Sequence, residues 1–345
     1  MPQSLISIVV PVYNATSTLE LCVNSIQNQS FGDFELLLIN DGSTDCSLEL
    51  CNKFAIEDPR ISVIDKPNGG PSQTRNLGID NANGKYIVFV DSDDSVEPTY
   101  LEDLITARKN HPDAGHIWCG FKRMEFASKK TLQIICYSYD EHVNKSSRCE
   151  IMTLHKKWLD AGPVCKLYDA AILKKHNLKM DEQLSLGEDL LFNFDYLDAV
   201  ENTNIIIINK PNYNYMVYEA QRLSTKYYPD MFGIYKNIHS KMLDYITKWK
   251  CNQKQIELFY NAAFWKYEVV MQNTFDKQNL LGFFAKIKYN NKILKNKDFK
   301  DAFAMTQTRI NVVLKFAYYT GNYFFVMAAN SVLSLFSKIK KRGKV

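Results

Sequence analysis

Several signatures that would place a chain of 345 residues in a familiar class are missing here. The eight cysteines form no C-x-x-C pair and no Cys/His cluster with zinc-binding spacing, so we interpret them as reduced thiols of a cytoplasmic protein. The N-terminus lacks the basic segment and cleavage site of a signal peptide, and we expect it to begin with a buried strand. No G-x-G-x-x-G follows that strand, which excludes a dinucleotide-binding dehydrogenase.

Glycine (14 residues) and proline (10 residues) are scarce, and no stretch is of low complexity, as expected of a folded globular protein. Acidic residues become rare toward the C-terminus. Residues 1–229 contain 22 Lys/Arg and 31 Asp/Glu, whereas residues 230–345 contain 20 and 7. A basic tail of this kind suits an anionic lipid surface or nucleic acid, although such charge runs are often only solvated helix faces.

Short β-branched runs alternate with amphipathic segments from residue 5 to about 110, which predicts βαβ units and a mostly parallel sheet. Strands are expected at 6–12, 34–40, 61–65, 86–91, 114–120, 132–139 and 204–209, and helices at 17–29, 43–57, 169–176 and 188–199. Beyond residue 230 the pattern is helical. Ligands of open α/β sheets bind beyond the carboxyl ends of the strands, so Asn14, Asp41 and the carboxylates near Asp91 are expected to meet there.

The segment 316–336 contains no charged residue and is followed by a Lys/Arg-rich run at 338–344. Its length would suffice to span a bilayer. Its polar residues, however, fall roughly along one helical face, which favours an amphipathic helix near 311–342 that lies on a membrane with its basic end on anionic headgroups. The alternative is a helix packed on the rest of the chain or on a dimer partner.

Three carboxylates crowd into four positions where the strand expected at 86–91 ends: Asp91, Asp93 and Asp94. Asp91 and Asp93 can both reach a Mg²⁺ or Mn²⁺ that also takes phosphate oxygens, because hard cations prefer oxygen ligands. The alternative is that Asp93 or Ser95 caps the helix that follows.

Four other motifs accompany this cluster: Ile8-Val-Val-Pro-Val-Tyr-Asn14, Ile39-Asn-Asp-Gly-Ser-Thr-Asp45, Asn68-Gly-Gly-Pro-Ser-Gln-Thr-Arg-Asn76 and Gly187-Glu-Asp189. In order, spacing and residue types, the five motifs resemble glycosyltransferase family 2. The resemblance covers roughly residues 1–220. It implies an α/β GT-A domain over 1–229, with a Rossmann-like, mostly parallel sheet flanked by helices, and a helical C-terminal region over 230–345.

The resemblance implies that Pro11, Tyr13 and Asp41 hold the base of a nucleotide sugar. A tyrosine ring can stack on a pyrimidine, and a carboxylate can accept the N–H of its ring. The alternatives are rim packing for Tyr13 and, for Asp41, a cap of the next helix, expected at 43–57.

The resemblance also implies a diphosphate site. Asn68, Gly69 and Gly70 would let the backbone approach the donor closely, and Arg75 would pair with the diphosphate, unless it is simply a solvated helix residue. The segment Asp91-Ser92-Asp93 would contact the donor and hold Mn²⁺ or Mg²⁺. Pro71 and Thr74 depart from the residues that the family more often shows, which we expect to alter the stiffness of the loop.

Asp189 matches the carboxylate of the family that removes the acceptor's proton, with Glu188 as the second choice. Like-charge repulsion within such a pair raises the pKa of one member. The alternative is a charged first turn of the helix expected at 188–199, favoured by the helix dipole. Trp158 and Lys166 also match a family segment and are candidates for the acceptor site, with core packing and a surface lysine as alternatives. A flap over the diphosphate is suggested for Arg222, Ser224 and Thr225.

Together these features predict an inverting transferase that moves a sugar to a glycan or lipid-linked saccharide at the cytoplasmic face of the membrane, with a UDP-sugar as the expected donor. The basic C-terminal region would meet the anionic membrane surface, nucleic acid is not expected as a partner, and a homodimer is left open. Two alternatives are a catalytically silent nucleotide-sugar-binding module and a sugar-phosphate nucleotidyltransferase. A nucleotidyltransferase would have a Gly-rich basic loop after the first strand. The chain lacks this loop, because Pro11-Val-Tyr-Asn14 occupies that place.

Overall fold

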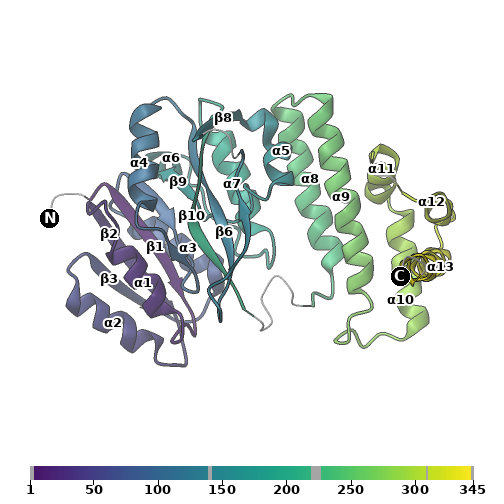
Figure 1. Cartoon of the computed structure of the whole chain (residues 1–345), viewed down its shortest axis with the longest axis horizontal. Coiled ribbons are helices and arrows are strands. Elements are labelled where there is room, and N and C mark those ends of the chain that lie inside the picture. Colours follow the sequence, from purple (N-terminus) through teal and green to yellow (C-terminus); the bar gives the residue numbers. More distant parts are fainter. Residues whose placement is uncertain (1–3, 139–141, 219–226, 308–309, 343–345) are drawn as a thin grey trace. The chain divides into compact units, whose positions relative to one another are not determined.

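The protein is described by a computed structural model that covers residues 4–138, 142–218, 227–307 and 310–342, with only the backbone described from 334 to 342. The chain divides into two compact units, which are described separately below (Figure 1). One comprises residues 1–221 with 247–250, and the other comprises 222–246 with 251–345. None of the eight cysteines, all of which lie in the described residues, forms a disulfide.

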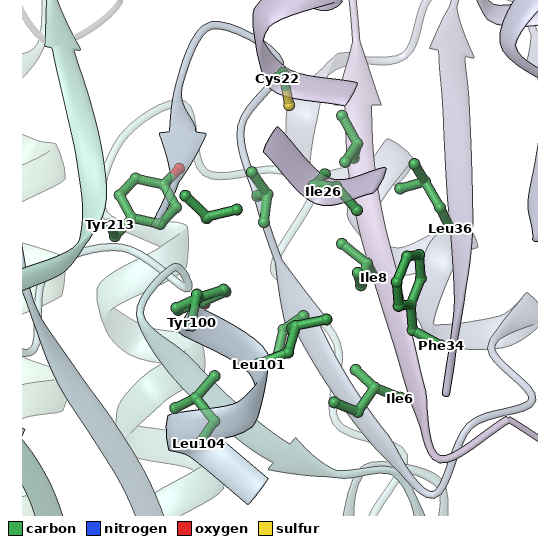
Figure 2. Close-up of a cluster of buried hydrophobic side chains, with 14 of the residues drawn as sticks. Ile6, Ile8, Cys22, Ile26, Phe34, Leu36, Tyr100, Leu101, Leu104 and Tyr213 are labelled. Atoms are coloured by element: carbon green, nitrogen blue, oxygen red, sulfur yellow. The ribbon is translucent and has the colours of Figure 1, made fainter. Parts of the chain in front are cut away.

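The central strand of the first unit, β1 (Ile6–Val12), is buried on both faces. Successive strand residues point to opposite faces, so the even-numbered residues of β1 join one apolar cluster and Val9 joins another. The first cluster contains side chains of α1 (Leu19–Gln27), α2 (Ser47–Glu57) and α4 (Tyr100–Asn110). Figure 2 shows Ile6 and Ile8 within it. Helices α1, α2 and α4 therefore cover one face of the sheet.

Four strands form a parallel half-sheet in the order β3-β2-β1-β4, with β2 at Phe34–Asp41, β3 at Ile61–Lys66 and β4 at Tyr86–Phe89. These strands confirm the four expected in this region, although β4 ends two residues early. Because the strands are parallel, their carboxyl ends lie along one edge. The motifs that follow β1, β2 and β4 therefore come to the same side of the sheet.

The other half of the sheet is mixed. Here β9 (Lys166–Asp169) runs antiparallel to β4 and to β6 (His116–Glu125), and β10 (Asn204–Val217) runs parallel to β6. Three short strands pair antiparallel to β6 or β10: β5 (Ser95–Val96), β7 (Thr131–Ile135) and β8 (Val143–Ser147). The sequence predicted that this strand ends at 209, but β10 continues past Pro211. Its pairing with β6 shifts register on either side of Pro211, which cannot donate a hydrogen bond to the ladder.

Helix α3 (Gly70–Asn81) is absent from the helices that periodicity predicted. Its buried residues include the polar residues Ser72, Thr74, Arg75 and Asn76, so no apolar stripe marks it in the sequence. The second cluster of the core contains side chains from α3, α6 (Ala170–Lys175) and α7 (Glu188–Ala199), while α5 (Ile151–Lys156) precedes β9.

The second unit is helical throughout its described part. Its helices are α8 (Met231–Lys248), α9 (Gln253–Asn273), α10 (Phe283–Lys295), α11 (Lys297–Met305), α12 (Val312–Tyr319) and α13 (Tyr323–Arg342). Phe264, Phe299 and Tyr318 pack together with ring centroids 5.7–6.0 Å apart. Among the residues that the structure describes, no helix combines the length and the apolar character needed to cross a membrane.

Candidate active site

The ends of β1 and β2 are tied together by Asn14. This residue adopts a left-handed backbone conformation (φ 49°), which asparagine tolerates better than most residues. Its side-chain oxygen accepts a hydrogen bond from the Thr44 N–H at 2.8 Å, and its own N–H donates to Ser43 Oγ at 3.1 Å. Next to it, Tyr13 is exposed and Pro11 is half-buried in β1.

Asp41, at the end of β2, is buried and fastens the segment that leads into α3. Its carboxylate accepts the N–H groups of Gly69 (2.8 Å) and Gly70 (2.9 Å) and pairs with Lys66. The side chain of Asn68 donates to the Asp41 carbonyl at 2.9 Å. Asp41 therefore binds the backbone at the start of α3, whereas α2 is preceded by Cys46, so the alternative that Asp41 caps the next helix is wrong. The proposed contact with a nucleotide base stays a prediction.

Gly70 is the first residue of α3 and has a φ of +86°, which favours glycine. A Cβ atom at this position would meet nothing within 4 Å, so the surface above it is open. Pro71 follows in the first turn, where its missing N–H costs nothing. Thr74 is fully buried and donates to the Gly70 carbonyl at 2.9 Å. These two residues stiffen the start of the helix.

Arg75 projects from α3 to the residues that follow β4. Its Nη2 donates to Oδ1 of Asp91 at 2.6 Å, and only 10% of its side chain is exposed. Its Nε is buried and has no hydrogen-bond partner among the described residues. Burial by itself would lower the pKa of Arg75, but Asp91, Asp189 and Glu188 raise it, so the guanidinium is positively charged.

The three carboxylates after β4 have different environments. Asp91 is half-buried and paired with Arg75, whereas Asp93 is exposed and its carbonyl accepts the Tyr218 hydroxyl at 2.6 Å. Asp94 is buried and accepts the Tyr213 hydroxyl and the Met216 N–H, each at 2.7 Å.

Burial, together with the charges of Asp93 and Asp91, raises the pKa of Asp94 well above its ordinary value. Asp94 therefore fastens β10 to the loop and is not among the residues expected to bind ligands. Neither Asp93 nor Ser95 caps α4, because Thr99 precedes that helix and Ser95 lies in β5.

The described residues contain no cluster of three or more His, Cys, Asp or Glu side chains arranged to hold a metal ion. Asp91 and Asp93 nevertheless suit a hard cation whose remaining ligands come from a bound phosphate or water, because such ions often use only one or two protein carboxylates. Asp93 is exposed and Asp91 is half-buried, so both lie where a ligand can approach. The expected metal residues therefore fit this kind of site.

Glu188 and Asp189 form the first turn of α7. The preceding Gly187 has a φ of +80°, so a residue with a Cβ would be strained at this helix start. The segment before it is tied to α3, since Asn76 donates to the Met180 carbonyl at 2.9 Å and accepts the Met180 N–H at 2.8 Å. Asn76 thus holds this segment to the helix that carries Arg75.

The pair has unusual protonation behaviour. Burial and the adjacent charge of Asp189 raise the pKa of Glu188 from 4.5 to about 7. Burial also raises the pKa of Asp189, and the positive charge of Arg75 opposes that shift. A carboxylate with a raised pKa is a stronger base, so the pair has the chemistry needed to accept a proton near neutral pH.

A loop before β9 lies against Asp189. A Cβ atom at Gly162 would be 3.9 Å from Oδ2 of Asp189. Asn193, one turn further along α7, fixes this loop. Its side chain donates hydrogen bonds to the carbonyls of Asp160 and Gly162 at 2.7 Å each. The side-chain oxygen of Asn193 accepts the Tyr168 hydroxyl at 2.5 Å, so this buried amide is well bonded.

Lys166 supports the same loop. It is 1% exposed, and its Nζ donates to the carbonyls of Gly162 (2.8 Å) and Val164 (3.2 Å). Burial lowers its pKa. The alternative of a surface lysine is wrong, and the structure gives Lys166 bonds to the protein itself, so its proposed contact with an acceptor stays a prediction.

Trp158 has a different position. It is 66% exposed and adopts a left-handed backbone conformation (φ 65°), which is strained for an aromatic residue. The alternative that it packs in the core is wrong. An exposed ring on a strained backbone four residues before Gly162 is available to a ligand.

Sequence reasoning missed four residues that organise the site: Asn76, Asp94, Asn193 and Tyr213. Asp94 stood in the acidic cluster, but its burial depends on β10, which is more than a hundred residues away. Asn76 is the last residue of the motif that begins at Asn68. Its hydrogen-bond partner, Met180, lies in a segment for which the sequence predicts no helix or strand. The suggested flap residues Arg222, Ser224 and Thr225 lie outside the described residues.

An α/β sheet of this topology, with polar motifs at the ends of parallel strands and a carboxylate pair at a helix start, defines a GT-A-type domain. The model of the family described as "Glycosyl transferase family 2" matches residues 7–176. Over this part, which is just under half of the chain, the protein is similar to glycosyltransferase family 2.

Two curated relatives show how far the similarity extends. "Glycosyltransferase GlyA" of Streptococcus pneumoniae is 46% identical over 99 residues, which is 29% of this chain and 14% of GlyA. "Uncharacterized glycosyltransferase EpsJ" of Bacillus subtilis is 32% identical over 204 residues, which is 59% of this chain and 58% of EpsJ. The chain therefore spans less than two thirds of either relative's length.

Among solved structures, residues 1–349 of TarS from S. aureus, in complex with UDP-GlcNAc, resemble the protein with a TM-score of 0.70. The similarity covers 96% of this chain and 91% of that one, at 20% sequence identity. This likeness shows the fold. The expected α/β GT-A fold with a helical C-terminal extension is confirmed.

Proposed function

We propose that the protein is a metal-dependent, inverting hexosyltransferase that uses a nucleotide diphosphate sugar, with UDP as the expected nucleotide. The observation that carries this proposal is the position of Arg75. It binds Asp91 at 2.6 Å, and its charge acts on both Glu188 and Asp189. One cation therefore joins the residues expected at the diphosphate to the residues expected at the acceptor.

On the donor side, Tyr13 would stack on the base, with Pro11 beside it and Asp41 accepting the N–H of the ring. The open surface above Gly70 would let the diphosphate approach the start of α3, together with Asn68 and Gly69. Arg75 would stabilise the departing diphosphate, since its Nε has no partner in the described part of the chain.

Asp93 and Asp91, with Ser92 between them, would hold Mn²⁺ or Mg²⁺ against the diphosphate. When bound, such an ion neutralises negative charge that develops on the leaving group. The hydrogen bond from Arg75 holds the Asp91 carboxylate in place for this role.

On the acceptor side, Asp189 would accept the proton of the attacking hydroxyl, with Glu188 as the second choice. A single displacement of this kind inverts the configuration at the anomeric carbon and needs no covalent intermediate. The pKa of Asp189 is raised by burial, which suits a general base. Trp158 would offer its exposed ring to the acceptor sugar, and Lys166 would shape the loop between them or touch the acceptor.

The acceptor is proposed to be a glycan or lipid-linked saccharide in surface polysaccharide synthesis. One similar protein is named chondroitin synthase of Pasteurella multocida, which is 28% identical over 251 residues that make up 25% of its length. We propose residues 1–229 as the catalytic domain and 230–345 as a region that meets the cytoplasmic face of the membrane. A homodimer remains part of the proposal to be tested, and nucleic acid is not a proposed partner.

The first experiment measures release of nucleoside diphosphate from a panel of nucleotide sugars, with Mn²⁺ or EDTA and membrane extract as the source of acceptor. Wild type is compared with Asp93→Ala and Asp189→Asn, and with Asp244→Asn as a control for an exposed carboxylate outside the site. We expect one donor to be turned over with metal only. Both site variants should lose at least about 100-fold in rate, whereas the control should match wild type.

Donor binding separates the roles of the two residues. We expect Asp189→Asn to bind the donor as wild type does and Asp93→Ala to bind it more weakly. If a donor is bound but none is turned over, the catalytically silent module is the better account. If no donor is bound, or if both variants turn it over as wild type does, the assigned site is wrong. Formation of nucleotide sugar from a nucleoside triphosphate and a sugar phosphate would support the nucleotidyltransferase instead.

A further inference from the structure

The outward face of α12 is apolar, which is the reverse of the pattern for a helix at a protein surface. Val312 is 80% exposed, and Phe316 and Tyr319 follow it at the spacing of one helix face and are also exposed. Ala317 and Tyr318 face inward and are buried. A surface helix normally turns its polar side to water, so this face has the character of a binding surface.

The next helix repeats the pattern. In α13, Phe324, Phe325 and Val332 are exposed, whereas Val326 and Ala329 are buried. A turn at Gly321 joins the two helices, and Figure 1 shows both of them nearly end-on beside α10. The two outward faces therefore belong to neighbouring helices of the same unit.

A third apolar segment lies at the start of α10, in the loop that leads into it. Four of the five residues from 280 to 284 are exposed and hydrophobic: Leu280, Leu281, Phe283 and Phe284. Phe275 connects this segment to α13, since its ring centroid lies 6.4 Å from that of Phe283 and 5.9 Å from that of Tyr323. We call the exposed apolar residues of these three segments the aromatic face: Leu280, Leu281, Phe283, Phe284, Val312, Val313, Phe316, Tyr319, Phe324, Phe325 and Val332.

The aromatic face lies within the most basic part of the chain. Residues 277–345 contain 14 Lys/Arg and 2 Asp/Glu, and no acidic residue follows Asp301. Lys288, Lys292 and Lys315 are exposed on α10 and α12. Aromatic side chains interleaved with lysines are typical of surfaces that insert into the headgroup region of anionic bilayers.

We propose that the aromatic face docks on an anionic lipid bilayer, with its phenylalanines at the level of the acyl chains and its lysines on the headgroups. This proposal deepens the membrane association proposed above by naming its surface, and it does not depend on glycosyl transfer. A second copy of the chain is a poorer occupant, because it would bring together two strongly positive regions that each contain only two acidic residues.

The test is sedimentation of the full chain with vesicles of phosphatidylcholine alone or with 30% phosphatidylglycerol (about 0.1 M salt). We expect binding to the anionic vesicles only. Phe284→Ser and Phe316→Ser should each weaken it about 10-fold, because each removes one exposed aromatic ring that would be buried in the bilayer. Ile56→Ser is the matched control, since Ile56 is 86% exposed on α2 and Phe284 is 84% exposed. It should bind vesicles as wild type does.

A second test replaces lysines of α10 and α12. The triple substitution Lys288→Gln, Lys292→Gln and Lys315→Gln should weaken binding to anionic vesicles at least about 10-fold, since each lysine near such a surface contributes measurably. Wild-type binding should also fall as salt rises to about 0.5 M. Circular dichroism of each variant checks that the helices remain folded.

Three results would overturn the proposal. They are equal binding by wild type and Phe variants, equal binding to neutral and anionic vesicles, and a change of the molar mass in solution in the Phe variants without a change in vesicle binding. The last result would assign the aromatic face to self-association. Donor turnover in detergent should be the same in wild type and Phe284→Ser, so failure of this proposal and failure of the transferase proposal are distinguishable.

Discussion

Arg75 donates a hydrogen bond to Asp91 at 2.6 Å, and the same guanidinium opposes the rise in pKa of Asp189, more than a hundred residues further along the chain. This buried cation is shared by the two carboxylate groups to which the proposed mechanism gives different tasks. The electrostatic state of the base therefore depends on the residue expected to hold the donor. That dependence makes the role of Arg75 measurable through the pH profile as well as through the rate.

Replacing Arg75 with glutamine should shift the acid limb of the pH–activity profile, where activity falls as the base becomes protonated, to higher pH. Without the positive charge, the ionised form of Asp189 is less favoured, its pKa rises, and more of the base is protonated at a given pH. Donor affinity should fall at least about 10-fold. The pH dependence of kcat/KM and the Kd of the donor check both effects.

Arg60→Gln is the matched control, because Arg60 pairs with Asp58 at 2.7 Å away from the site. It should leave the acid limb where it is. An unchanged limb in Arg75→Gln would contradict the electrostatic link.

Glu188→Gln should move the acid limb in the opposite direction. Removing the neighbouring negative charge favours the ionised form of Asp189, so activity should persist to lower pH. A loss as large as that of Asp189→Asn would instead make Glu188 the base. The measurement is the rate of transfer between about pH 5 and pH 8 with saturating donor.

The same substitution should stabilise the fold. The pKa of Glu188 is raised from 4.5 to about 7, so the folded state holds a proton that the unfolded state releases, and the free energy of unfolding falls as pH rises through this window. Glutamine removes this cost, which is about 1 to 3 kcal/mol at pH 8 and smaller at pH 5. Denaturant titrations at both pH values test it, and an equal gain at the two values would contradict it.

Asn193→Ala should loosen the loop beside Asp189. It removes the Asn193 hydrogen bonds to the Asp160 carbonyl, the Tyr168 hydroxyl and the Gly162 carbonyl, the last of which keeps Lys166 as a donor, at a cost of about 2 to 4 kcal/mol. We expect a higher KM for acceptor with a nearly unchanged donor Kd. Asn24→Ala is the control, since Asn24 is exposed on α1, and it should change stability by no more than about 0.5 kcal/mol.

Trp158→Gly should separate stability from function. Glycine relieves the left-handed backbone strain, so the fold should gain about 1 kcal/mol, while the loss of the exposed ring should raise the KM for acceptor. Lys129→Gly is the control, because Lys129 also has a positive φ (55°) but lies in the turn before β7. Greater stability with normal acceptor kinetics in Trp158→Gly would remove Trp158 from the acceptor site.

The sequence by itself determined the parallel half of the sheet and the order of the motifs. Apolar runs such as Ile6–Val12 are buried on both faces and cannot be satisfied elsewhere, so their pattern identifies them without tertiary information. It also predicted α7 with its boundaries, because Glu188 and Asp189 open an apolar helical pattern. The helical character of the C-terminal region followed from the same kind of pattern.

Only the tertiary structure decided which carboxylate in each motif faces solvent and which serves the fold. Asp91, Asp93 and Asp94 are equivalent in sequence, but β10 buries Asp94 and Arg75 pairs with Asp91. Asp41 and Lys166 likewise bond to nearby backbone atoms once their loops close over them. Burial and hydrogen bonding come from segments far apart in the chain, so no local pattern contains them.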